Sequence, residues 1–389
     1  MAPIYGKRFQ HALSPLQLGR SLVLKNRTYF APMGIDLASV DGSMSEPMAR
    51  FYEGIINGGC GMVVLGNASV DASTRLQRRG LCLHNEKHAR SLAPLIDYGI
   101  KYDCPVVVQL QHYGAQGSTE CTGLPLLGPS GVACGRMQRT DPAYRTRPMD
   151  LADITTVRRQ FAEAAYMALQ AGAKLIQLQA SNGYLLSSFL SPYTNKREDD
   201  YGGTPLRRAR LLLEVIEDIQ AATGNSLEIS VRLGIDDCVG SAGQQPHLLR
   251  EVVNALERAG VVAIMCSISI GETFGHMMRP TAETRQSLIE SVRLIKTYAS
   301  VPVGFAGFVS TLDQVELNLI DGTADLVGMT RALFADNDLI LKSVAEQDHL
   351  IYACRFDGNC FRDKSNPQLD RVYCCVNPNY LRPDHISYS

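Results

Sequence analysis

Residues 179–203 read QASNGYLLSSFLSPYTNKREDDYGG and follow directly on the apolar run KLIQLQ, residues 174–179. The run ends in the carboxamide Gln179, and a second carboxamide, Asn182, follows three residues later. Tyr184 stands just beyond Asn182, and a charged loop follows. In a (β/α)8 barrel the active-site residues lie at the carboxyl ends of the strands. The stretch therefore predicts one unit of such a barrel, together with part of its site.

Further apolar runs, bounded by Gly, Pro or charged residues, resemble this one. They are rich in Val, Ile and Leu without alternation, as expected of parallel strands covered on both faces. Between them lie helical patterns, two of which begin at clear signals, Asp150 as an N-cap and Pro205 after Thr204. The predicted strands cover residues 29–33, 61–66, 105–110, 174–179, 227–232, 262–267, 302–305 and 325–329, and the predicted helices cover 45–57, 85–102, 150–171, 205–222, 246–259, 281–299, 311–320 and 331–345.

Strict alternation of strands and helices implies right-handed crossovers and a parallel sheet. Eight such units favour a closed (β/α)8 TIM barrel over an open doubly wound sheet. A dinucleotide-binding sheet would also need G-x-G-x-x-G after its first strand, and none stands there. We expect a barrel over residues 1–347, long functional loops at 111–149 and 180–204, and a cysteine-containing C-terminal extension at 348–389.

Composition narrows the class of protein. The 389 residues are 45% hydrophobic and 20% charged, with a formal net charge of −1, which removes any general attraction to nucleic acid or anionic membranes. No apolar run approaches a membrane span, and residues 1–16 lack the apolar core of a signal peptide. Eleven dispersed cysteines do not form a secreted disulfide framework. A cytoplasmic protein is expected, and homo-oligomerisation stays open.

Several separated segments resemble the old yellow enzyme family, in particular its branch with bacterial 2,4-dienoyl-CoA reductase and trimethylamine dehydrogenase. These segments, in chain order, are SPLQLGRSLVLKNRTYFAPMG, VVVQLQHYGAQ, SNGYLLSSFLSP with NKREDDYGG, VRLG, FAGFVS and ADLVGMTRALFAD. They span roughly residues 13–342. Each motif alone is weak, but their order and their places at strand ends are together specific.

The resemblance implies a site for flavin mononucleotide (FMN). In the family, the segment Ala31, Pro32, Met33 and Gly34 passes under the flavin through backbone contacts. Gln109 falls on a position that hydrogen-bonds the isoalloxazine ring, and Arg232 on one at its pyrimidine edge. Thr or Cys in many relatives touches flavin O4 at the position of Gly34, and glycine offers no such side chain. The remaining positions that the resemblance assigns to the cofactor are Gly66, Gly307, Gly328, Thr330 and Arg331, the last four in loops that would bind phosphate.

Physical chemistry agrees with two of these assignments. A phosphate in a barrel commonly lies on the loops after the last two strands, where Gly307 permits close backbone approach and Arg331 offers a bidentate cation. Arg232 ends an apolar strand, so its charge needs a partner, and a reduced flavin is anionic along its N1–O2 edge. The alternative is an internal ion pair of Arg232 with Asp236 or Asp237.

The end of the fourth predicted strand suggests the chemistry. Tyr184 is a neutral phenol that can donate a proton to an activated alkene while hydride arrives from flavin N5. Gln179 and Asn182 are placed to bind the substrate carbonyl oxygen as charge accumulates on it. The alternative is that both carboxamides satisfy loop backbone and that Tyr184 packs as a core residue. His276 resembles a histidine that works with the tyrosine in the dienoyl-CoA reductase branch; an exposed or capping histidine is the alternative.

The extension resembles a degenerate iron–sulfur segment. In the related branch C-x-x-C-x-x-x-C is followed by C-x-V-N-P; here Cys374 matches the last cysteine, and only Cys354 and Cys360 stand for the triple. A [4Fe–4S] cluster would need Cys375 or Asp357 as its fourth ligand, which favours loss of the cluster over its retention. Zinc is the other metal that these four thiols could bind.

These observations together predict an FMN-dependent ene-reductase. NADH or NADPH would reduce the flavin, and a small-molecule enone, enoate or enoyl thioester would then accept hydride. Two alternatives stay open, an amine-oxidising (N-demethylating) flavoenzyme and a non-catalytic flavin-binding subunit. The amine reaction would need an aromatic cage for a cation, and the chain has no tryptophan to build one.

Overall fold

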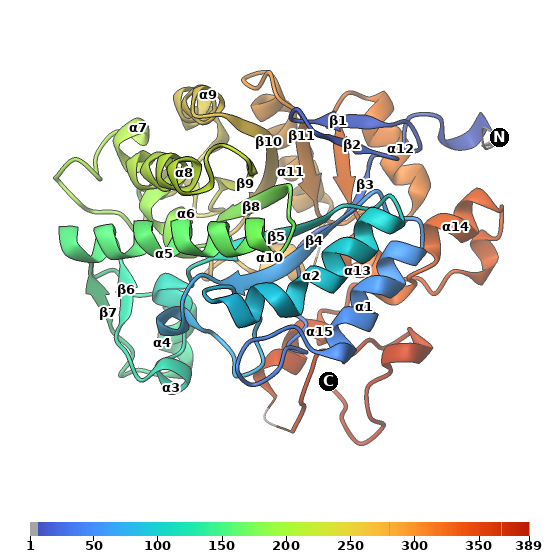
Figure 1. Ribbon diagram of the computed structural model, residues 1–389, viewed down its shortest axis with the longest axis horizontal. Helices are drawn as coiled ribbons and strands as arrows, with labels where there is room; N and C mark the ends of the chain where they lie inside the picture. Colours follow the sequence, from blue (N-terminus) through green and yellow to red (C-terminus); the bar gives the residue numbers. More distant parts are fainter. Residues whose placement is uncertain (1–6, 280, 367, 389) are drawn as a thin grey trace.

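Eight parallel strands close into a barrel in the computed structural model of the chain, which describes residues 7–279, 281–366 and 368–388 (Figure 1). Each strand pairs with its neighbours along the chain, and β12 pairs with β3 to complete the ring. All the predicted strands are confirmed to within a few residues, and so is the TIM-barrel fold. The barrel strands are β3 (Thr28–Phe30), β4 (Met62–Ser69), β5 (Val106–Gln111), β8 (Leu175–Ala180), β9 (Glu228–Asp236), β10 (Val261–Ile268), β11 (Val303–Ala306) and β12 (Leu326–Gly328).

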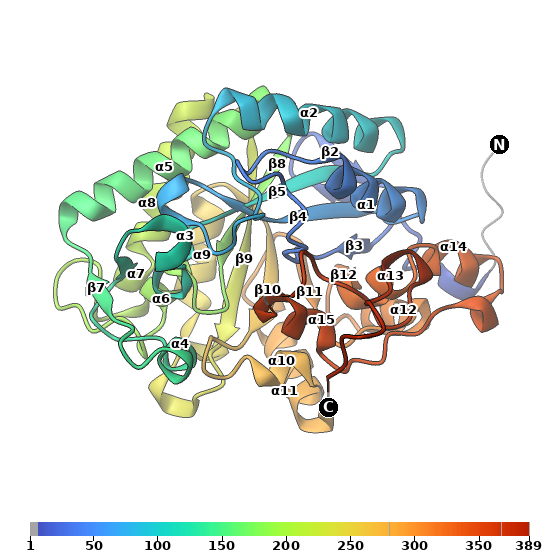
Figure 2. The same cartoon turned by 90° about the horizontal axis from the view of Figure 1, so that it is seen from below.

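Helices surround the barrel and bury its outer apolar face (Figures 1 and 2). Asp150 caps α5 as predicted, in a capping box with Asp153. The predicted helix at 331–345 is divided in two because the Asp336 carboxylate accepts hydrogen bonds from Asp338 N and Tyr352 N, outside any helical pattern. The helices are α1 (Glu46–Asn57), α2 (Glu86–Lys101), α5 (Leu151–Gln170), α7 (Pro205–Arg208), α8 (Arg210–Thr223), α9 (Arg250–Arg258), α11 (Ala282–Lys296), α12 (Leu312–Ile320), α13 (Thr330–Ala335) and α14 (Leu339–Val344).

Several short elements were not predicted because three to six residues carry too little periodicity. The hairpin of β1 (Leu16–Leu18) and β2 (Leu22–Leu24) packs Leu18 and Leu24 against the apolar interior of the barrel. The long connection after β5 contains the strand pair β6 (Leu126–Gly128) and β7 (Thr146–Pro148). The other short helices are α3 (Thr119–Thr122), α4 (Gly135–Thr140), α6 (Leu185–Leu190), α10 (Gly275–Met278) and α15 (Asn359–Arg362).

The C-terminal extension folds back over the barrel, and Figure 2 shows α15 beside α10 and the ends of β10 and β11. Asn377 Nδ2 donates to the Phe334 carbonyl at 2.8 Å, and Val372 N donates to the Ile35 carbonyl at 3.4 Å. The Tyr380 ring packs on Phe334, with centroids 5.5 Å apart. The extension is therefore part of the wall around the carboxyl ends of the strands.

Among the described residues, no helix has both the length and the apolar character that crossing a membrane requires.

Candidate active site

A cavity opens at the carboxyl ends of the strands and contains about 1000 Å³ of space, part of it continuous with solvent. Most of the predicted site residues line it: Pro32, Met33, Gly34, Gln179, Asn182, Tyr184, Arg232, Gly307, Gly328, Thr330 and Arg331. Four predicted residues are not in its lining: Ala31, Gly66, Gln109 and His276.

Arg232 on β9 presents a guanidinium to this cavity. Its one hydrogen bond to a described residue runs from Nη2 to Ser267 Oγ at 3.3 Å, and no described carboxylate forms an ion pair with it. Burial lowers the pKa of Arg232, against the opposing effect of the phenols of Tyr29 and Tyr184. An anionic group in the cavity would supply the missing partner.

The alternative partners of Arg232 are engaged elsewhere. Asp236 accepts from Cys238 N at 2.7 Å, and Asp237 accepts from Ser191 Oγ at 2.5 Å and from Gln244 N at 2.7 Å. Burial raises the pKa of Asp237 to about 6, the opposite of what a neighbouring guanidinium would do. The structure thus excludes the internal ion pair among the described residues.

Tyr184 stands at the N-cap of α6 and lines the cavity. Its ring meets the Tyr113 ring edge to face, with centroids 5.5 Å apart and an interplanar angle of 86°. Backbone hydrogen bonds fix both neighbours in the chain, since Leu185 N donates to the His112 carbonyl at 3.1 Å and Gly183 N to Ser187 Oγ at 3.2 Å. Tyr184 is therefore held between fixed residues and faces the cavity rather than the core.

The side-chain amide groups of Gln179 and Asn182 differ in whether described residues already accept their N–H hydrogen bonds. Gln179 Oε1 accepts from Ser181 Oγ at 2.7 Å, and no described residue accepts a hydrogen bond from its Nε2. Asn182 Nδ2 donates to the Ile268 carbonyl at 2.9 Å and to Ser267 Oγ at 3.2 Å. Gln179 is thus free to donate into the cavity, whereas Asn182 ties the β8 loop to the end of β10.

Asn182 and Gly183 also set the direction of this loop. Both adopt left-handed backbone conformations, with φ of 61° and 77°. Asn and Gly are the residues that tolerate this region. The consecutive left-handed residues turn the chain sharply from β8 into α6 and so place Tyr184 over the strand end.

The backbone of Pro32, Met33 and Gly34 forms one side of the cavity. Gly66 lies directly behind it, because a Cβ built on Gly66 would be 2.4 Å from Met33 N and 2.8 Å from Pro32 C. Ala31 is buried, and its carbonyl accepts from Thr330 Oγ1 at 3.1 Å. Ala31 and Gly66 thus support the cavity wall without being part of its lining.

Gln109 is fully buried, and both ends of its carboxamide are paired. Nε2 donates to Gln177 Oε1 at 2.7 Å, and Oε1 accepts from Asn67 Nδ2 at 2.8 Å. Asn67, and not Gln109, lines the cavity. Asn67 was missed in the sequence, although a polar residue at the end of β4 is the kind of signal that identified Gln179.

The loops after β11 and β12 form the end of the cavity where the resemblance places a phosphate. Gly307 and Gly328 line the cavity there. Arg331 Nη1 and Nη2 donate to the carbonyls of Met278 and Met277, each at 3.0 Å, and its guanidinium stacks on the Phe356 ring at 4.5 Å. Burial lowers the pKa of Arg331. A phosphate would compete with two carbonyls for this side chain.

His276 is exposed on α10 and does not line the cavity, although its neighbours Met277 and Met278 do. The extension supplies further lining residues that sequence patterns could not identify: Phe356, Cys360, Phe361 and Lys364. They lie in a segment without periodicity, so no strand end or helix face marks them. Phe361 packs against Phe274 of the β10 loop with ring centroids 4.7 Å apart.

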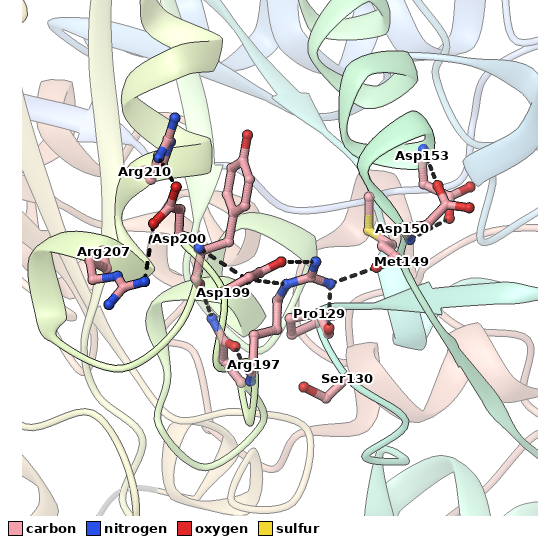
Figure 3. Close-up of polar contacts among 12 residues, drawn as sticks. Pro129, Ser130, Met149, Asp150, Asp153, Arg197, Asp199, Asp200, Arg207 and Arg210 are labelled. Atoms are coloured by element: carbon pink, nitrogen blue, oxygen red, sulfur yellow. Dashed lines mark hydrogen bonds and ion pairs between the residues drawn. The ribbon is translucent and has the colours of Figure 1, made fainter.

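The charged block after Tyr184 has a structural role (Figure 3). Arg197 donates to the carbonyls of Pro129 at 3.0 Å and Met149 at 2.5 Å, and it pairs with Asp199. Asp200 pairs with Arg207 and Arg210 on the following helices, each at 3.1 Å. The contacts of this charged block therefore connect the β8 loop to the β6–β7 connection and to the following helices.

Two of the tail cysteines make hydrogen bonds within the C-terminal extension. Among the described residues, no group of three or more His, Cys, Asp or Glu side chains is arranged to hold a metal ion. Cys375 Sγ donates to Asp357 Oδ2 at 3.2 Å, and Cys374 Sγ accepts from Asn377 N at 3.4 Å. Burial raises the pKa of Cys360 to about 11, and burial with the Asp357 carboxylate raises the pKa of Cys375 to about 12.

The chain matches known proteins over most of its length. Residues 12–348 match the model of the NADH:flavin oxidoreductase / NADH oxidase family. The chain is 30% identical over 376 residues to NADH oxidase of Thermoanaerobacter brockii, covering 95% of this chain and 56% of that protein. It is 27% identical over 325 residues to NADPH dehydrogenase of Clostridium acetobutylicum, covering 83% and 92%.

Solved structures show the same fold. A 2-naphthoyl-CoA reductase complex superposes with a TM-score of 0.84 at 22% identity, covering 95% of this chain and 57% of that one. This chain thus spans little more than half the length of the NADH oxidase and of this reductase.

Proposed function

Because the chain belongs to the NADH:flavin oxidoreductase / NADH oxidase family, we propose that its cavity binds FMN and that it is an ene-reductase. NADH or NADPH is the proposed reductant, and the proposed acceptor is a carbon–carbon double bond conjugated to a carbonyl, as in an enone, an enoate or an enoyl thioester. The observation that supports the proposal most strongly is Arg232, a cation that lines the cavity and has one hydroxyl partner among the described residues.

The residues present fit the cofactor. Bound FMN would supply hydride transfer between the nicotinamide and the electron-poor alkene. Arg232 would hold the electron-accepting edge of the ring, and its fixed charge would favour the reduced state. The backbone from Pro32 to Gly34 would support the ring, and the loops at Gly307 and Gly328 would admit the phosphate, with Arg331 beside it.

Two side chains on the β8 loop would act on the substrate. Gln179 has an unused amide N–H group at the cavity, which can donate to a carbonyl oxygen and stabilise the negative charge that develops there. Tyr184 can then deliver a proton to the alkene from its neutral phenol. Asn182 would position this loop, because its amide group is directed at the end of β10.

The substitution Tyr184→Phe tests the proposal, because it removes the proton donor and keeps the ring. Stopped-flow absorbance would measure flavin reduction by NAD(P)H separately from reoxidation by an enone such as cyclohexenone. We expect the first rate to stay within about twofold and the second to fall by at least about 100-fold, within the usual contribution of general acid catalysis.

The matched control is Tyr166→Phe, which removes a hydroxyl from the exposed face of α5. It should leave both rates unchanged. Equal reoxidation rates in Tyr184→Phe and wild-type protein would rule out Tyr184 as the donor. A wild-type protein that binds flavin but transfers no electrons to any enone would contradict the ene-reductase assignment itself.

A further inference from the structure

The extension places a lysine in the cavity at the position that Gly34 leaves open. A Cβ built on Gly34 would lie only 2.7 Å from Lys364 Nζ, so the ammonium lies against the backbone of Gly34 and would have to shift if position 34 carried a side chain. Lys364 lines the same cavity as Pro32, Tyr184 and Arg232. The absence of a side chain at Gly34 thus leaves room for the ammonium where it stands.

The backbone at Lys364 is held by the contacts of its neighbour in the chain, Asp363. Asp363 is 2% exposed, accepts from Arg382 Nε and Nη2 at 2.9 Å each, and accepts from Tyr373 N at 2.9 Å. A bidentate, buried pair of this kind fixes backbone direction more strongly than a surface ion pair. The charge of Lys364 is therefore presented by a folded segment.

The ammonium group of Lys364 is not neutralised by a carboxylate among the described residues. Within the described part of the chain, Lys364 makes no hydrogen bond or ion pair. Asp36 Oδ1 would lie 3.7 Å from the same Cβ built on Gly34, so a carboxyl group stands near this wall without pairing with the ammonium. Burial raises the pKa of Asp36, while the nearby charge of Lys364 and a hydrogen bond from Gln77 oppose that rise. Lys364 thus acts on this wall of the cavity through its field.

We propose that Lys364 is a cofactor-contacting residue, whose ammonium faces the ring bound against Pro32, Met33 and Gly34 and stabilises negative charge on it. The proposal rests on the proposed flavin site and adds a second cation to Arg232. Because a cation binds the reduced, anionic ring better than the oxidised, neutral one, Lys364 raises the reduction potential of the cofactor. The extension is then a device that tunes the cofactor, in the place where a Thr or Cys side chain would otherwise stand.

Redox titration of the flavin-loaded protein tests this inference without using catalytic activity. The midpoint potential would be measured by absorbance against a reference dye for wild-type protein, Lys364→Met and Lys364→Arg. Lys364→Met keeps the length of the side chain and removes its charge. It should weaken binding of the reduced ring relative to the oxidised ring about tenfold, which lowers a two-electron potential by about 30 mV. Lys364→Arg should retain most of the wild-type potential.

The matched control is Arg371→Gln, which removes a cation of the extension that does not line the cavity and should leave the potential unchanged. A potential for Lys364→Met equal to that of wild-type protein would overturn the inference, as would a loss confined to the KM of an anionic substrate. Failure of the wild-type protein to bind FMN would instead overturn the proposed function, so the two failures are distinguishable.

Discussion

Two arginines of the same cavity have opposite surroundings. Arg232, in β9, lies on what we call the floor of the cavity, and Arg331, in α13, lies on what we call its rim. On the floor, Arg232 extends from a barrel strand and meets a single hydroxyl among the described residues. On the rim, Arg331 has two carbonyl partners and an aromatic ring beneath it. A cation left without partners by the fold is available to a ligand, whereas a satisfied cation helps to hold the fold. We therefore propose that Arg232 serves binding and that Arg331 serves mainly to hold the fold, and substitutions can test this distinction.

The largest effect is expected on the floor. Arg232→Met should weaken FMN binding by about 100-fold, because it removes a charged hydrogen bond worth about 1.5–3 kcal/mol. Its free energy of unfolding should stay within about 1 kcal/mol of wild type, since Ser267 is the one described residue that loses a hydrogen bond. Fluorescence titration with FMN and urea unfolding of the apoprotein would measure the two quantities. A strongly destabilised Arg232→Met with unchanged affinity would reverse the assignment.

The second-largest effect is expected in the pH dependence of stability, and it tests whether Asp237 pairs with Arg232. The folded-state pKa of Asp237 is raised to about 6 by burial, above its ordinary value. Such a group contributes stability below its unfolded pKa and loses it as the pH rises through the folded pKa. Between about pH 4 and pH 7, wild-type protein should therefore lose stability relative to Asp237→Asn, by on the order of 2 kcal/mol.

Urea unfolding of both proteins across this pH range measures the difference. If Asp237 were instead paired with Arg232, its pKa would be depressed and wild-type protein would gain stability relative to Asp237→Asn as the pH rises. Whether the stability of wild-type protein relative to Asp237→Asn falls or rises with pH thus decides whether Asp237 is unpaired or paired with Arg232.

The smallest effect is expected at the rim. Arg331→Gln should lower the free energy of unfolding by about 1–2 kcal/mol, because the carbonyls of Met277 and Met278 lose charged donors. It should weaken FMN binding less than Arg232→Met does. Urea unfolding and flavin titration of the same preparation provide both values. Equal losses of FMN affinity in Arg331→Gln and Arg232→Met would contradict the distinction between the two arginines.

The floor was also the part that could be predicted well from the sequence. Barrel strands are continuous Val, Ile and Leu runs, so their ends, and with them Gln179, Tyr184 and Arg232, could be located from these runs, while the resemblance supplied the cofactor position of Arg232. The N-cap at Asp150 was equally clear, because a cap acts within one turn of its helix.

The rim could not be predicted in the same way. Phe356 and Lys364 reach the cavity through the path of an aperiodic segment, which is set by long-range contacts such as Asp363 with Arg382. The hydrogen bonds of Asn182 depend on where the end of β10 lies, which its own neighbours in the sequence do not specify. Local pattern therefore located the strand ends but not what packs over them.

The flavin assignment, on which the proposed chemistry depends, is decided by the visible absorption spectrum of the purified protein, followed by identification of any chromophore released on denaturation. We expect a yellow protein with flavin bands, no broad iron–sulfur absorption, and release of FMN in a one-to-one ratio with the chain. A protein that is colourless as purified and stays colourless after incubation with FMN would contradict the assignment.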